Sequence, residues 1–271
     1  MNGLQSSSKI QNIAVFGLGE AGSLLAVDLL AAGNVVTGYD PKAVVTPFGI
    51  IRANSASDAV ANADIIIALT AGDDASEALE QAITDIPVST LYADFSTNSA
   101  KVKLAMAERA ASFAFDFVDV ALMTVVPGKG IHTPVMVAGV GASRFEAYFS
   151  TFGMPVTRIH GLAGDAATRK LLRSVMMKGL AAVVIESMRA GEAVGCAEWL
   201  WKNLCDEIAS ADTTLIARLV AGTQSHALRR LHEMECSTEL LKDLGVEPTM
   251  TLATVESLKS VLSKGIPAIP D

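Results

Sequence analysis

The chain has 271 residues, of which 51% are hydrophobic and 18% are charged, and its formal net charge is −8 at pH 7. This composition excludes a globally disordered chain, and the length suits one large domain or two ordinary ones. The negative charge disfavours a nucleic-acid partner because it repels phosphate backbones, although locally gathered cations can still bind a small anion.

Short apolar runs alternate with amphipathic stretches between residues 10 and 160. The sequence predicts strands over 13–19, 34–40, 63–70, 90–97, 113–120 and 134–140, with intervening helices that include 23–33, 74–83 and 99–111. Strands that alternate with helices predict crossover connections and a parallel sheet. Runs as apolar as ADIIIALT predict strands that are covered on both faces.

Strand signals stop after about residue 163. Helices are predicted over 165–194, 197–210, 213–221, 225–245 and 251–265. The predicted fold class is therefore α/β, with a Rossmann-type parallel-sheet domain over residues 9–162 and an all-α C-terminal domain over residues 163–271.

Cysteine usage and the apolar runs predict the compartment. The three cysteines are widely spaced and show no Cys/His pattern of a zinc site, so we expect reduced thiols and no metal. The polar start lacks the apolar core of a signal peptide, and the run VMMKGLAAVVIESM is interrupted by charges and too short to span a bilayer. We expect a soluble cytoplasmic protein with no membrane partner.

The segment FGLGEAG follows the first predicted strand and opens the first helix. It has the spacing GxGxxG, in which the glycines permit a tight turn, close approach of a pyrophosphate and close packing of the helix on the strand. The predicted cofactor-binding loop consists of Gly17, Leu18, Gly19, Glu20, Ala21 and Gly22. The alternative is that these glycines serve an ordinary tight turn.

Asp40 ends the second predicted strand, about twenty residues beyond the glycines. A carboxylate at this position accepts hydrogen bonds from ribose hydroxyls and repels a 2′-phosphate, which favours NAD over NADP. Asp40 can alternatively just begin a turn with Pro41. Lys42 and Arg52 lie close enough in sequence to accommodate a 2′-phosphate, so NADP stays open.

Together with the helical half, these motifs resemble the β-hydroxyacid dehydrogenases, which include 3-hydroxyisobutyrate and 6-phosphogluconate dehydrogenases. ALTAGDDA resembles the loop near the nicotinamide ribose, DFSTNSAK the D-x-S-[ST] segment, FVDVALMT the substrate segment, and GLAGDAATRK the catalytic G-x-x-G-x-G-x-x-x-K. The resemblance implies that Lys170 is the general acid and base for the substrate hydroxyl. It adds Thr70, Ala71 and Ser96 as cofactor-binding residues, and Ser96, Thr97, Met123, Thr124 and Ser174 as substrate-binding residues.

The chain departs from the family pattern around these positions. Ala166 replaces a glycine of the lysine motif, and Ser174 replaces the asparagine four residues after the lysine. Met123, Thr124 and Val125 stand where the family has S-G-G. Met177 stands where decarboxylating phosphogluconate enzymes have a glutamate, which argues against decarboxylation by the usual pair of residues.

The end of the chain resembles a side branch of the family with a distinctive C-terminal helical domain. His226, Arg229, Arg230 and Glu233 are spaced so that they share one helix face, and Arg230 is a candidate for binding the substrate anion. An exposed ion-pair ladder between these arginines and Glu233 explains the same pattern.

The sequence thus predicts an NAD(P)-dependent oxidoreductase that transfers a hydride between nicotinamide and a small hydroxy acid or sugar acid. A reductase of imines or other carbonyl compounds, or a non-catalytic dinucleotide sensor, are the alternatives. Relatives that reduce imines tend to replace the lysine, so Lys170 disfavours that class. The resemblance also implies a homodimer.

Overall fold

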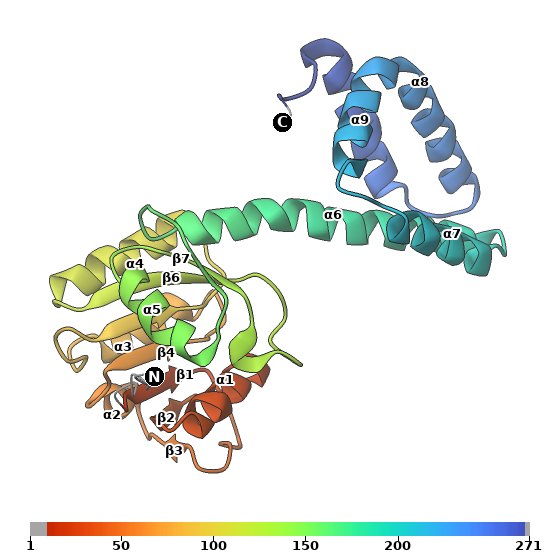
Figure 1. Cartoon of the computed structure of the whole chain (residues 1–271). Coiled ribbons are helices and arrows are strands. Elements are labelled where there is room, and N and C mark those ends of the chain that lie inside the picture. Colours follow the sequence, from red (N-terminus) through yellow and green to blue (C-terminus); the bar gives the residue numbers. More distant parts are fainter. Residues whose placement is uncertain (1–9, 269–271) are drawn as a thin grey trace, which may run out of the picture. The chain divides into compact units, whose positions relative to one another are not determined.

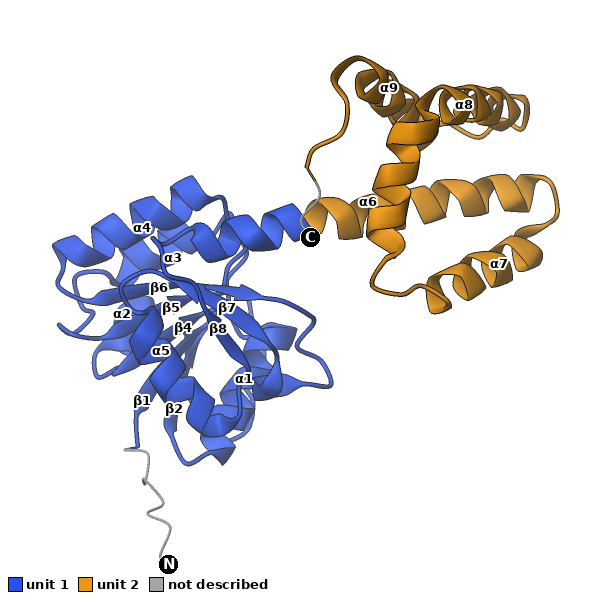
Figure 2. Cartoon of the chain, turned by 45° about the horizontal axis from the view of Figure 1, so that its top comes forward, with its two compact units in different colours: residues 1–173 blue, residues 174–271 orange. Residues whose placement is uncertain are grey.

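The computed structural model describes residues 10–268 and divides into two compact units, one ending at Arg173 and one beginning at Ser174 (Figure 2). The division falls inside helix α6 (Asp165–Ala193), whereas the boundary predicted from the sequence lies just before this helix. Ala166 and Ala167, in the first turn of α6, are buried. The start of the helix therefore belongs to the packing of the first unit.

The first unit contains one sheet, and most of the connections between its strands contain helices (Figure 1). Its strands are β1 (Asn12–Phe16), β2 (Val35–Tyr39), β3 (Ile51–Arg52), β4 (Ile65–Ala68), β5 (Leu91–Asp94), β6 (Asp116–Leu122), β7 (Val135–Ala138) and β8 (Val156–Arg158). Its helices are α1 (Glu20–Ala31), α2 (Ala56–Val60), α3 (Ala75–Ala82), α4 (Ala100–Ser112), η1 (Gly130–His132), α5 (Ala142–Phe149) and η2 (Ser150–Phe152).

The strand order is β3-β2-β1-β4-β5-β6-β7-β8. The first six strands of this order run parallel, which confirms the predicted Rossmann-type domain, but β7 is antiparallel to β6. The connection from β6 to β7 contains only the short η1, and a parallel neighbour needs a crossover, usually through a longer helix. The sheet is therefore mixed at this side and not wholly parallel as predicted.

Alternating side chains of each central strand enter two apolar cores, one on each face of the sheet. Ile13 and Val15 of β1 pack in one core, and Ala14 and Phe16 in the other. Helices α1 and α5 cover the first face, and α2, α3 and α4 cover the second. This burial on both faces explains why the strands carry near-continuous apolar runs.

The second unit is helical, as predicted. It contains the remainder of α6 together with α7 (Ala197–Ala209), α8 (Leu215–Asp243) and α9 (Thr249–Lys264). The two helices predicted over 213–221 and 225–245 form the single helix α8, which has a kink with non-helical φ and ψ at His226. None of the helices in the described range 10–268 is long and apolar enough to cross a membrane.

The kink in α8 is stabilised by side chains that bind carbonyls of the preceding turn. The Thr223 hydroxyl donates to the Leu219 carbonyl over 2.7 Å, and the Arg230 guanidinium donates to the same carbonyl over 3.2 Å. Arg230 also donates to the Thr223 hydroxyl. Such bonds compete with the regular helix ladder and accompany bends.

Glu186 of α6 binds the start of α9. Its carboxylate accepts hydrogen bonds from the amides of Met250 and Thr251, at 2.7 and 2.9 Å, and from the Thr251 hydroxyl at 2.6 Å. Burial alone raises the pKa of this carboxyl, but the bonds from Thr251 and Met250, with the charge of Arg189, outweigh it and lower the pKa overall. The ionised form is therefore the stabilising one.

We expect Glu186→Gln to lower the free energy of unfolding of the second unit by about 2 kcal/mol at pH 7, because hydrogen bonds to charged groups contribute about that much. The difference from wild type is full above about pH 5, since an unfolded glutamate has a pKa of about 4.3. It disappears as the pH falls through the lowered pKa of the folded protein. Urea unfolding across this pH range measures it. Glu192→Gln, an exposed glutamate on the same helix, is the control and should change little.

Candidate active site

Most predicted site residues lie at one edge of the sheet. They follow the carboxyl ends of five parallel strands: Gly17–Gly22 after β1, Asp40 after β2, Thr70 and Ala71 after β4, Ser96 and Thr97 after β5, and Met123 and Thr124 after β6. The strand order reverses between β1 and β4, and ligands of open α/β sheets bind beside such a point. Spatial proximity of these segments thus follows from the topology.

The glycine loop has two glycines that the fold requires and one that it does not. A Cβ atom on Gly17, whose φ is +85°, would lie 2.5 Å from the Leu69 carbonyl oxygen, and one on Gly22 would lie 1.9 Å from the Gly17 carbonyl oxygen. A Cβ on Gly19 would meet nothing within 4 Å among the described residues. An ordinary tight turn therefore explains Gly17 and Gly22, whereas open space beside Gly19 fits the approach of a ligand to the start of α1.

Asp40 both makes a turn and lies against the glycine loop. Its Oδ1 accepts hydrogen bonds from the amides of Lys42 and Ala43, at 2.7 and 3.1 Å, and its Oδ2 accepts one from the Leu18 amide at 2.8 Å. A carboxylate has about four acceptor positions, so one is left for a ribose hydroxyl. Asp40 can therefore both stabilise the turn after β2 and accept a hydrogen bond from a ribose.

A cleft of about 370 Å³ lies between these loops. Its lining includes Gly17 and Gly19, Asp40 and the predicted residues Thr70 and Ala71. The Thr70 hydroxyl oxygen is buried and has no hydrogen-bond partner within residues 10–268. Buried hydroxyls are normally satisfied, so an orphaned one at the wall of a cleft fits a polar ligand. Together with the glycine loop, these residues fit a dinucleotide.

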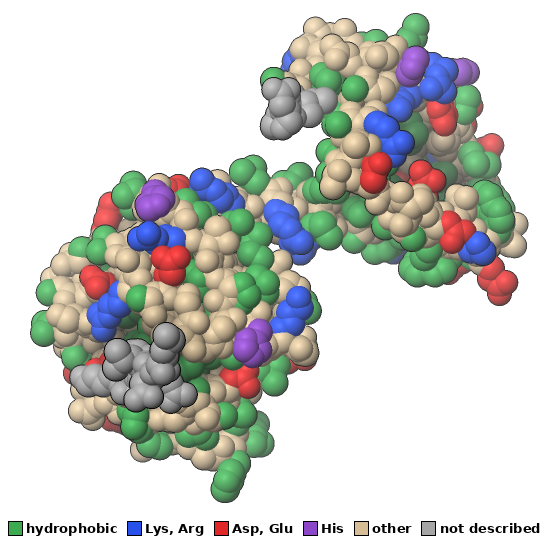
Figure 3. Space-filling view, in the orientation of Figure 1, with side chains coloured by type: hydrophobic (Ala, Val, Ile, Leu, Met, Phe, Trp, Pro, Cys, Tyr) green, Lys and Arg blue, Asp and Glu red, His purple; other side chains and the backbone are tan. Residues whose placement is uncertain are grey.

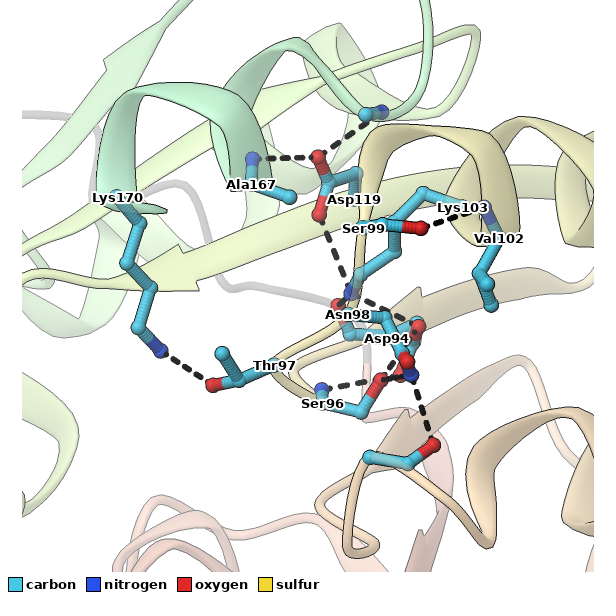
Figure 4. Close-up of polar contacts among 12 residues, drawn as sticks. Asp94, Ser96, Thr97, Asn98, Ser99, Val102, Lys103, Asp119, Ala167 and Lys170 are labelled. Carbon is cyan, nitrogen blue, oxygen red and sulfur yellow. Dashed lines mark hydrogen bonds and ion pairs between the residues drawn. The ribbon is translucent and has the colours of Figure 1, made fainter. Parts of the chain in front are cut away.

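Lys170 reaches the loop after β5. Its Nζ donates a hydrogen bond to the Thr97 hydroxyl over 2.9 Å, as Figure 4 shows. The neighbouring Ser96 is buried, and its hydroxyl donates to the Asp94 carboxylate and accepts from Asn98. Thr97 thus presents the hydroxyl that meets the lysine, whereas Ser96 holds the shape of the loop.

A buried ion cluster that was not predicted from the sequence is formed by Lys103, Asp94 and Asp119, and Figure 4 draws it together with Thr97 and Lys170. The Lys103 Nζ lies 2.8 Å from an Asp94 carboxylate oxygen and 3.2 Å from an Asp119 carboxylate oxygen, and all three side chains are 0% exposed. Lys103 also donates to the Asp94 main-chain carbonyl over 3.0 Å. Lys103 shares the buried face of α4 with Met106 and Ala110, and a lysine in that i, i+3, i+7 pattern is the signal that could have revealed it.

The cluster connects the two segments that carry Thr97 and Lys170. Asp119 accepts hydrogen bonds from the amides of Gly164 and Ala167, at 3.0 and 2.9 Å, and so satisfies the N-terminal end of α6. Asp94 accepts from the Ser96 amide at 3.0 Å in the other segment. A carboxylate at a helix N-terminus is electrostatically favourable, so the cations in the first turns of α6 are tolerated.

The remaining predicted residues lie after β6, on α6 and on α8. Met123 packs near Ala166 in a small apolar cluster, and Ser174 lies one turn after Lys170 on α6. Arg230 lies on α8 in the second unit, where it binds Leu219 and Thr223 at the kink. Arg229 and Glu233 form an exposed ion pair with 3.7 Å between charged atoms, as the ion-pair alternative expects. The substrate-binding role of Arg230 stays a prediction.

Residues 12–153, more than half of the chain, match the family model described as the NAD binding domain of 6-phosphogluconate dehydrogenase. The chain belongs to this family. Residues 192–261 of this 6-phosphogluconate dehydrogenase family member match a second model, described as a domain of unknown function (DUF1932). The resemblance identified in the sequence is thereby confirmed, including its unusual C-terminal domain.

Individual relatives are distant. An uncharacterized 28.5 kDa protein from Methanothermus fervidus is 26% identical over 145 residues, which cover 54% of this chain and only 56% of that protein. An imine reductase from Myxococcus stipitatus in complex with NADP⁺ is 17% identical with a TM-score of 0.80, covering 94% of this chain and 95% of that one. A reductive aminase from Aspergillus terreus in complex with NADPH, cyclohexanone and allyl amine is 17% identical with a TM-score of 0.79 and 95% coverage of both chains. These structures share the fold with the 6-phosphogluconate dehydrogenase family chain.

Proposed function

We propose that the chain is an NAD(P)-dependent dehydrogenase of a small hydroxy acid or sugar acid, with Lys170 as its general acid and base. The observation that carries this proposal is the hydrogen bond from Lys170 to Thr97 at the carboxyl edge of the sheet, where the dinucleotide cleft also opens. Membership of the 6-phosphogluconate dehydrogenase family supports the coenzyme class.

The residues divide the binding and the chemistry between them. The amides at the start of α1 would bind the pyrophosphate, and Asp40 would bind the adenosine ribose. A bound nicotinamide supplies the acceptor for the hydride that leaves the carbinol carbon. The unprotonated Lys170 amine takes the hydroxyl proton in the same direction, and its ammonium returns that proton in reduction. Thr97 holds Lys170 in place and can hydrogen-bond the same substrate oxygen.

NAD is the coenzyme that the cleft favours in this proposal. Asp40 lies at the ribose end, and the charged residues of the lining are three carboxylates and one lysine. A 2′-phosphate carries additional negative charge, so it would meet repulsion there that NAD does not meet. An anionic substrate, in contrast, would lie near the ammonium of Lys170, whose Nζ reaches Thr97.

An imine or carbonyl reductase is the second candidate. It is favoured by the extent of the structural likeness, since an imine reductase and a reductive aminase match nearly the whole chain. Lys170 argues for the hydroxy acid, because a hydride transfer to an already protonated iminium needs no lysine to move a proton at oxygen.

Coenzyme titration followed by a substrate screen tests both candidates. We expect the full chain to bind NADH, and to reduce NAD⁺ in the presence of a short hydroxy acid or a sugar acid, followed by nicotinamide absorbance. Oxidation of NAD(P)H with cyclic imines but not with oxo acids would support the second candidate. A chain that binds neither NADH nor NADPH would contradict both.

We also infer that the chain acts as a homodimer through the apolar helices of its second unit. All thirteen residues of α7, each within the described range, are at least partly exposed, and Trp199 and Trp201 are 66% and 55% exposed. Val175, Met176 and Ile185 of α6 are also exposed, and hydrophobic side chains show on the second unit in Figure 3. Exposed apolar surface of this extent is typical of interfaces, and symmetric dimers are the commonest assembly. Light scattering should give twice the monomer mass, and a monomer at micromolar concentration would contradict the inference.

A further inference from the structure

The rim of the dinucleotide cleft carries an ion pair between two loops. The Lys42 Nζ lies 2.7 Å from a carboxylate oxygen of Asp74, and both residues line the cleft. Lys42 follows β2, and Asp74 lies between β4 and α3. Hydrogen bonding to Asp74 and the attraction of its charge raise the pKa of the Lys42 ammonium. The lysine is therefore held in its charged form and directed at Asp74.

Asp74 is not needed to cap the helix that it precedes. It occupies the N-cap position of α3, but its side chain makes no capping hydrogen bond. An exposed ion pair of this kind contributes little to folding stability. The pair therefore matters for which ligand the cleft binds, and not for the stability of the fold.

Arg52 is the other cation near this end of the cleft, and its guanidinium is hydrogen-bonded to the loop after β2. Its guanidinium donates to the main-chain carbonyls of Asp40 and Ala43, at 2.6 and 3.1 Å, and to the Thr46 hydroxyl at 3.1 Å. Both cations that the sequence offers for a 2′-phosphate therefore have protein partners. The lining contributes no other lysine or arginine within residues 10–268.

We propose that Asp74 is a specificity-determining residue, which disfavours NADP by holding Lys42 away from the 2′-phosphate and by adding its own negative charge to those of Asp40 and Glu77. The inference rests on the proposed function, in which this cleft binds a nicotinamide dinucleotide. NAD presents uncharged hydroxyls where NADP has the phosphate, so its affinity depends little on Asp74.

Replacing Asp74 should change the coenzyme preference. We expect Asp74→Asn to lower the Kd for NADPH about tenfold and to change the Kd for NADH by no more than about twofold, because one carboxylate is removed and one lysine is released. Asparagine is also a good N-cap residue, so α3 should be retained. Titrations of the full-length protein with NADH and NADPH, followed by calorimetry, measure both constants without a substrate.

Two further variants show whether Lys42 is the responsible cation. In a Lys42→Met background, Asp74→Asn should improve NADPH binding by only about twofold, since repulsion is relieved but no lysine is released. Asp73→Asn removes the same charge one position earlier from a residue outside the cleft lining, and it should leave both constants unchanged. An equal gain in NADPH affinity from Asp73→Asn would mean that any nearby negative charge has this effect, and it would overturn the proposal.

Different binding results would contradict the role of Asp74 and the proposed coenzyme cleft. If wild type binds NADH but Asp74→Asn leaves the NADH to NADPH ratio unchanged, the role of Asp74 is overturned while the coenzyme cleft stands. If the tenfold gain persists in the Lys42→Met background, the ion pair is overturned as its cause. If wild type binds neither coenzyme, the proposed function itself is wrong, and the role of Asp74 is overturned with it.

Discussion

Lys170→Ala should lower the turnover number about a thousandfold, because a general acid or base contributes about 10²- to 10⁴-fold to a rate. The binding of NADH should change by less than about threefold, since Lys170 contacts Thr97 and the pyrophosphate is bound elsewhere, at the start of α1. The measurement is steady-state kinetics with the substrate that the screen identifies, together with a coenzyme titration of the same variant.

Two matched variants separate proton transfer from charge. Lys170→Arg keeps a cation and hydrogen-bond donors, but a guanidinium does not lose its proton in proteins, so we expect a loss nearly as large as for alanine. Arg169→Ala removes the neighbouring cation, whose guanidinium donates to the Asp165 carbonyl, and should stay within about threefold of wild type. Full turnover by Lys170→Ala would falsify the assignment of the lysine.

Lys103→Met should lower the free energy of unfolding of the first unit by about 3–5 kcal/mol, the usual cost of removing one partner from a buried ion pair. Methionine has a similar length and leaves no large cavity, so the loss measures the charge. It leaves Asp94 and Asp119, both 0% exposed, without the ammonium that lies between them. Denaturant unfolding followed by circular dichroism gives the free energy.

The control for this prediction lies on the same helix. Lys101→Met removes an identical charge from an exposed position of α4 and should change the free energy of unfolding by less than about 0.5 kcal/mol. Similar losses of unfolding free energy in the two variants would contradict a specific stabilising role of the buried cluster. A destabilised Lys103→Met should also lose order at the start of α6, because Asp119 binds the Gly164 and Ala167 amides there.

The order of the site residues along the chain could be predicted from the sequence. Each chemistry-bearing segment follows an apolar run, and parallel strands bring their carboxyl ends to one edge. The glycine loop after β1 and Asp40 after β2 are therefore placed by local patterns, whereas Thr97 after β5 was singled out by the resemblance of its segment to the family. The short strands β3 and β8 were missed, because two or three residues at exposed positions carry no apolar pattern.

The direction of each side chain could not be predicted in the same way. Ser96 and Thr97 are equivalent in a sequence motif, yet Ser96 turns inward to Asp94 and Thr97 meets Lys170. The antiparallel β7 likewise depended on how the segment after β6 returns to the sheet. These features are decided by distances between segments that are remote in the chain.

The sequence by itself determined the α/β class and the glycine loop, because period and glycine spacing are local properties of the chain, and the resemblance to the family singled out Lys170. Only the tertiary structure decided which charges are partners. Lys101 and Lys103 look alike in the sequence, but one is exposed and the other lies between two buried carboxylates. The sequence offered Lys42 for binding a phosphate, but in the structure Asp74, thirty-two residues away in the chain, binds its ammonium. Charges interact through spatial distance and local solvation, and folding alone sets both.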